Sequence, residues 1–158
     1  MPFGIEHSRV WRVAAAAMVL FTLVAPSLLT ARAEPSIEEL KGRVANAPVT
    51  DRPPMCIQIS ERQLSEADRL YLAGDSEKAL ATLADVVAYS ELARDYAIQA
   101  HKHEKQSEIA IRKMARKLAD IKHTVSHEDQ DQIQNTIDRL QQIRDDLLAA
   151  MFSKDGKK

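Results

Sequence analysis

One cysteine and two pairs of histidines are the side chains in this 158-residue chain whose chemistry could serve a site. Cys56 follows Pro53-Pro54-Met55. A lone thiol in an oxidising compartment could join two chains or bind a partner. The interpretation we favour is a small apolar residue buried at a helix start, because no base that would activate the thiol can be assigned from the sequence.

The histidines do not form a recognisable metal site. His101 and His103 are two residues apart, so on a helix their side chains point about 200° apart and cannot share a metal ion. His123 and His127 are four apart and Glu128 is adjacent, but a predicted helix break separates them. A loop metal site is the alternative to solvated histidines, and we predict no metal and no other cofactor.

Motifs typical of enzymes are absent from the sequence. It contains no H-E-x-x-H, no C-x-x-C-H, no G-x-x-x-x-G-K-[ST] and no G-x-S-x-G. We therefore predict that the protein is not an enzyme, and an enzyme that uses Cys56 is the weakest alternative.

A basic stripe, residues 112–117 (Arg-Lys-Met-Ala-Arg-Lys), could touch phospholipid headgroups or nucleic acid. The favoured explanation is an acidic helix packed beside it in the fold. The formal net charge of the chain is −1, and general nucleic-acid binding needs a surplus of Lys and Arg. We predict no nucleic-acid partner.

Residues 1–33 have the pattern of a secretory signal peptide. Arg9 and Arg12 precede an uncharged run from Val13 to Thr30, and Ala31-Arg32-Ala33 is a small-residue cleavage site. An uncleaved membrane anchor is the alternative, since the run could just span a bilayer. Cleavage after Ala33 would leave a periplasmic or secreted chain whose only membrane contact was through that peptide.

The remaining sequence predicts an all-α fold, since it has few Gly and aromatic residues and many strong helix formers. Ser36 to Glu39 is a capping box for a short helix, followed by an extended Pro-rich linker at 49–54. A second capping box begins at Ser60, although that helix could start near Ile57. The predicted parts are 34–56 (short helix and linker), 57–152 (helical domain) and 153–158 (flexible tail).

Gly74 and Asp75 end one helix and cap the next, and no Pro or Gly follows until after Asp155. Apolar residues then recur at alternating steps of three and four, which is typical of a coiled-coil seam. Ser126 begins the last helix with a similar seam. The predicted interaction seam consists of Leu83, Val86, Ala93, Ala97, Ala100, Ile111, Met114, Leu118, Ile121, Ile133, Ile137, Leu140, Leu147 and Met151.

The charges predict how the last helices pair. Residues 102–122 carry a net charge of +4 and residues 128–146 a net charge of −4, and a short loop makes the two segments antiparallel. We expect antiparallel hairpins around one long central helix, 76–122, with three main helices and a short N-terminal one. A straight central helix would favour a homodimer, whereas a bend at 101–107 would allow a compact bundle.

Residues 63–86 resemble part of a tetratricopeptide unit. The stretch from Ala67 to Leu83 has its small residue, Gly74-Asp75 turn and Ala79-Leu80-x-x-Leu83 pattern. In that family Ala79 and Leu83 pack between helices, but no second copy follows at the family's period. The chain from residue 34 onward also resembles exported helical bacterial proteins with no assigned activity, on Leu70–Asp75, Glu108–Ile121 and Leu147–Phe152. That resemblance implies fold and location, not chemistry.

These observations predict an exported, non-enzymatic helical scaffold or adaptor that mediates protein–protein contacts in the bacterial envelope. Its partner would be another protein or a second copy of the chain. The alternative function is a periplasmic stress chaperone or a metal-responsive helical protein, which suppressed aggregation of a client or stabilisation by zinc or copper would distinguish.

Overall fold

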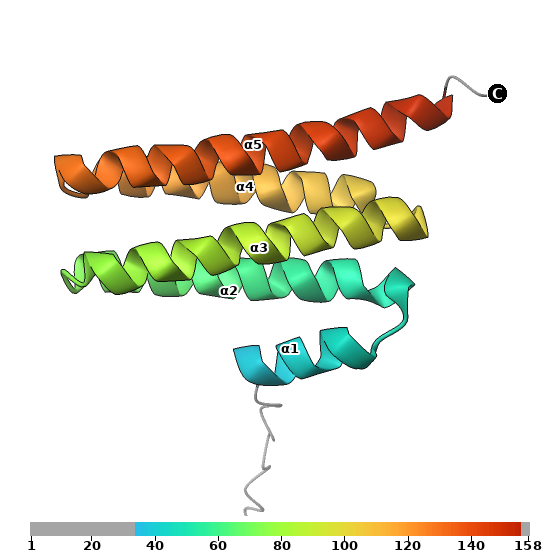
Figure 1. Cartoon of the computed structure of the whole chain (residues 1–158), viewed down its shortest axis with the longest axis horizontal. Coiled ribbons are helices and arrows are strands. Elements are labelled where there is room, and N and C mark those ends of the chain that lie inside the picture. The colour runs from blue at the N-terminus through green and yellow to red at the C-terminus, as the bar shows by residue number, and fades with distance from the viewer. Residues whose placement is uncertain (1–33, 156–158) are drawn as a thin grey trace, which may run out of the picture. The chain divides into compact units, whose positions relative to one another are not determined.

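A computed structural model describes residues 34–155, so the predicted signal peptide lies outside the described residues. The elements are α1 (Ile37–Asn46), a 3-10 turn η1 (Val49–Asp51), α2 (Arg52–Leu72), α3 (Ser76–Ala100), α4 (Glu104–Lys122) and α5 (His127–Asp155) (Figure 1). No strand occurs in this part of the chain, and the all-α prediction is confirmed. The last helix includes residues 153–155, which were predicted as tail.

Local signals set several helix ends as predicted. The Ser36 hydroxyl accepts a hydrogen bond from the Glu39 amide at 3.1 Å and caps α1, although the Glu39 carboxylate binds Arg43 instead of closing a capping box. The chain turns from α2 to α3 at Gly74, whose φ is +79°. Only glycine adopts this left-handed conformation without strain. Asp75 then accepts from the Lys78 amide and caps α3.

The start of α2 differs from the prediction. Residues 49–51 form a 3-10 turn instead of an extended linker, and α2 begins at Arg52 with Pro53 and Pro54 in its first turn. Proline is tolerated there because a first-turn N–H has no partner inside the helix. Ser60 is therefore an interior residue, and its buried hydroxyl donates to the Val86 carbonyl at 3.2 Å.

The expected long central helix is divided into α3 and α4. Helix α3 ends at Ala100, and His101 and His103 both have left-handed backbone conformations, with φ of 53° and 65°. Two such residues within three positions cannot continue a right-handed helix. The arrangement around one 76–122 rod is replaced by two helical hairpins, α2–α3 and α4–α5.

The two hairpins pack so that α2 runs parallel to α4 and α3 runs parallel to α5. Ser76 and Asp129 meet near the starts of α3 and α5, and Arg94 pairs with Asp146 further along both helices. Asp68 and Lys117 pair toward the ends of α2 and α4. Most packing is within each hairpin, followed by the α3–α5 contact and the smaller α2–α4 contact. Figure 1 shows the four long helices lying side by side, with α2 behind α3 and α4 behind α5.

The apolar seams face the interior of this four-helix arrangement. Twelve of the predicted seam residues belong to the buried core, whereas Ala100 and Met151 are only partly buried. The buried members are Leu83, Val86, Ala93, Ala97, Ile111, Met114, Leu118, Ile121, Ile133, Ile137, Leu140 and Leu147. Intramolecular packing thus occupies most of the seam that we had expected to present to a partner.

Helix α1 covers part of the α2–α3 hairpin. Leu40 and Val44 are buried against α2, and Lys41 lies over the Tyr89 ring at 5.7 Å. Close by, the Arg52 guanidinium lies 5.0 Å from the centre of the Tyr96 ring. Cation–π contacts of this kind add to the packing of apolar area.

Candidate functional site

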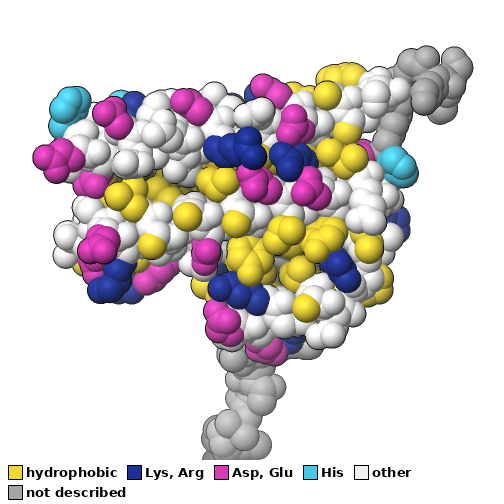
Figure 2. All heavy atoms as spheres, viewed as in Figure 1, with side chains coloured by type: hydrophobic (Ala, Val, Ile, Leu, Met, Phe, Trp, Pro, Cys, Tyr) yellow, Lys and Arg dark blue, Asp and Glu magenta, His cyan; other side chains and the backbone are white. Residues whose placement is uncertain are grey.

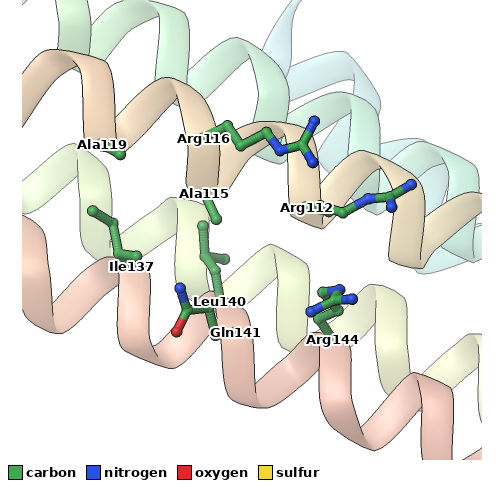
Figure 3. A pocket seen from close by; sticks show the side chains of 8 residues that line it. All are labelled: Arg112, Ala115, Arg116, Ala119, Ile137, Leu140, Gln141 and Arg144. Carbon is green, nitrogen blue, oxygen red and sulfur yellow. The ribbon is translucent and has the colours of Figure 1, made fainter.

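A groove between α4 and α5 is lined by both apolar and charged side chains. Its volume is about 360 Å³. That volume lies near the lower end of the range for ligand sites in proteins. Its lining, shown in Figure 3, is Arg112, Ala115, Arg116, Ala119, Ile137, Leu140, Gln141 and Arg144.

Small residues on α4 create this groove. Ala115 and Ala119 are one turn apart and face α5, where Ile137 and Leu140 supply the opposing wall. A methyl side chain leaves space that a leucine at the same position would fill. The accessible part of the apolar floor is therefore formed chiefly by the two half-buried alanines, since Ile137 and Leu140 are buried.

Three arginines form the rim. The buried carboxylate of Glu108 accepts from Arg144 at 2.7 Å and lies 3.7 Å from Arg112, so one carboxylate serves two guanidinium groups. Arg116 is exposed and forms no ion pair with any side chain that the structure describes, residues 34–153. The rim therefore has a net positive charge beside apolar surface.

The charge pairing between α4 and α5 differs from the prediction. The helices are antiparallel as expected, since Glu108 lies opposite Arg144 and Lys122 binds Gln134 at 2.8 Å. Their ion pair, however, joins an acid of the basic segment to a base of the acidic one. Among the basic α4 side chains, Lys117 pairs with Asp68 of α2, and Lys122 binds the neutral amide of Gln134.

Cys56 lies inside the protein and not at the groove. Its side chain is fully buried, and burial raises the pKa of its thiol to about 11. A thiol with such a pKa is almost entirely protonated near neutral pH and is a poor nucleophile. The position agrees with the favoured interpretation of a small packed residue near the start of α2.

The described histidines do not gather into a metal site. Among the described side chains, residues 34–153, no three His, Cys, Asp or Glu lie close enough together to hold a metal ion. His101, His123 and His127 are exposed at the ends of the helices. In the same part of the chain, no helix combines the length and apolar character needed to cross a bilayer.

A polar cluster joins the two hairpin turns at one end of the bundle. Asp129 is buried, and its carboxylate accepts from the Ser76 hydroxyl at 2.9 Å and from the Ser126 hydroxyl at 2.7 Å. The Tyr71 hydroxyl is also buried but has no hydrogen-bond partner among the described residues. Burial, with a smaller contribution from Asp129, raises the pKa of Tyr71 to about 12.

The sequence identified part of the groove. The basic stripe contained Arg112 and Arg116, and Ala115 within it and Ala119 just after it were available as a signal of a shallow face. Arg144 belongs to another helix, and nothing in the local sequence pairs it with the stripe. Comparisons of the chain with protein-family models, curated proteins and solved structures found no match.

Proposed function

We propose that the protein is an exported, non-enzymatic helical scaffold of the bacterial envelope, and that the groove between α4 and α5 binds a segment of a polypeptide. The observation that carries the proposal is the arginine rim over an apolar floor. An apolar side chain flanked by carboxylates, or an aromatic ring, has the chemistry to match both parts.

A bundle of packed helices supports such a role. Residues on helices are held more precisely than residues on loops, and the Glu108–Arg144 pair orients one of the three rim guanidinium groups. Arg116 needs no rearrangement to meet an incoming carboxylate, because no described side chain occupies it.

A discrete polypeptide fits the surroundings better than a large polyanion. The side chains of Asp131, Asp138 and Asp145 are exposed and recur every seven residues along α5, so they line one side of the helix. Their charges would repel an extended anionic surface such as a membrane or nucleic acid. Asp138 and Asp145 lie three and four residues from Gln141 of the groove, so a short segment meets two of these carboxylates and not the whole row.

Photo-crosslinking in cells tests the proposal. A photoreactive residue replaces Gln141, which lines the groove, or the exposed Gln99 of α3 as a matched control. We expect a covalent adduct with a polypeptide at position 141 that Arg116→Glu removes and Lys113→Glu, on the α2 side of α4, retains. Absence of any polypeptide adduct at 141 above the level at 99 overturns the proposal.

Export is a separate part of the proposal and rests on the residue pattern of 1–33. Cell fractionation should place the protein outside the cytoplasm, and its N-terminal sequence should begin at Glu34. A chain that remains in the cytoplasm with its initiator Met contradicts export.

A further inference from the structure

A large aromatic side chain is exposed near the end of α5. Phe152 is 68% exposed, and apolar side chains reach the surface near that end of the helix (Figure 2). Because Glu108 lies opposite Arg144 in the antiparallel hairpin, the start of α4 lies opposite about residue 150 of α5. The turn that carries Phe152 therefore extends past α4.

The groove has the chemistry to receive this ring. Its floor is apolar, and its rim holds three guanidinium groups. A guanidinium placed over an aromatic face is attracted to the ring, and arginine is the residue most often found in this contact. An exposed phenylalanine and an unfilled arginine-rimmed groove are thus complementary features of one chain.

The ring cannot enter the groove of its own chain. Gln141 of the groove and Phe152 are eleven residues apart on a continuous helix. They are therefore about 16 Å apart along the axis but on nearly the same side, since eleven residues make about three turns. The occupant has to come from another molecule.

We propose that the second copy's Phe152 occupies the groove, so that two chains pair through their α5 helices. This inference rests on the proposed function and names the polypeptide that the groove binds. An antiparallel pair of α5 helices centred near Asp146 places each Phe152 opposite Leu140 of the other copy. Both grooves are then filled by one two-fold contact.

The charges near the two-fold axis are mixed. Asp145 precedes Phe152 by seven residues and lies on the same side of α5, with a side chain that is 71% exposed. In a pair centred near Asp146 it lies within about one turn, along the axis, of both Arg144 and Asp145 of the other copy. The inference therefore rests on the contact between the ring and the arginine-rimmed groove and not on net charge.

Sedimentation of the purified protein from about 1 µM to 1 mM tests the pairing. We expect a monomer–dimer equilibrium whose dissociation constant rises about tenfold or more in Phe152→Ala and in Arg116→Glu. Leu72→Ala removes an apolar side chain that is 80% exposed on α2, and Lys113→Glu reverses a charge on the other side of α4. Both controls should dimerise within about twofold of the unchanged protein.

A paired-cysteine experiment tests whether position 152 of one copy lies at the groove of the other. A disulfide between positions 141 and 152 cannot form within one chain carrying both Gln141→Cys and Phe152→Cys. The Cα atoms of a disulfide lie within about 7 Å of each other, whereas those of residues 141 and 152 lie about 16 Å apart. Mixing the two single variants should give a crosslinked dimer joined through positions 141 and 152. Crosslinking only between identical positions contradicts the arrangement.

A protein that stays monomeric at the highest concentration overturns the inference, as does dimerisation unaffected by Phe152→Ala. If position 141 still captures a different polypeptide in cells, the proposed function stands while the pairing fails. If position 141 captures no polypeptide and the protein is monomeric, both fail.

Discussion

The carboxylate of Glu108 in α4 accepts a hydrogen bond from the guanidinium of Arg144 in α5 at 2.7 Å, and only 8% of the glutamate side chain is exposed. The pair joins a buried acid of α4 to a base from a helix rich in acids. Because a buried carboxylate is costly without a cation beside it, this contact favours one register of the α4–α5 hairpin over its neighbours.

Replacing this carboxylate with its amide should weaken the fold. In Glu108→Gln the two arginines lose their shared partner, and we expect the free energy of unfolding to fall by about 1–3 kcal/mol. Asp145→Asn is the matched control, since Asp145 lies 3.9 Å from Arg144 but is 71% exposed. Chemical denaturation measures both, and an equal loss in the two variants would argue against the buried pair.

Two glycines should respond oppositely to alanine. Gly74 has φ of +79°, and nothing lies within 4 Å of an added Cβ, so Gly74→Ala should cost about 1–2 kcal/mol from backbone strain alone. Gly42 lies inside α1 with equally open space, and Gly42→Ala should stabilise the protein by about 0.5–1 kcal/mol. Thermal unfolding compares them, and effects of the same sign would contradict this account.

The buried hydroxyl of Tyr71 should be dispensable for stability. It has no hydrogen-bond partner among the described residues, so Tyr71→Phe removes a desolvated polar atom without leaving another unpaired. We expect the free energy of unfolding at neutral pH to stay equal or rise by about 1 kcal/mol. A loss of more than about 1 kcal/mol would show that the hydroxyl has a partner that contributes to the fold.

The buried Cys56 thiol should make the stability of the fold sensitive to alkaline pH. Its pKa rises from 9.0 to about 11 on burial, so the unfolded chain loses this proton at lower pH than the folded protein does. The corresponding stability is present below pH 9 and is lost as the pH rises toward 11. Denaturation between these pH values should show a smaller decline in Cys56→Ala.

Thiol labelling gives a second measurement of the same site. A thiol reagent should react slowly with the native protein near pH 8 and rapidly after denaturation, because the native side chain is fully buried. Fast labelling of the native protein would mean that the start of α2 opens readily.

The sequence by itself determined the helical class, the caps at Ser36 and Asp75, the turn at Gly74 and the apolar face of each long helix. These features depend on neighbours within a few positions, where backbone hydrogen bonding and side-chain periodicity act directly. Arg112 and Arg116 of the groove were visible for the same reason, as adjacent members of one basic stripe.

Only the tertiary structure decided how those faces combine. It divided the expected rod after Ala100, began α2 at Arg52 and joined Glu108 to Arg144 against the net charges of their segments. An apolar stripe specifies that a helix needs a partner but not which helix supplies it, because burial is non-directional. Register and groove instead follow from side-chain volumes and single ion pairs across the contact, which residues distant in sequence contribute.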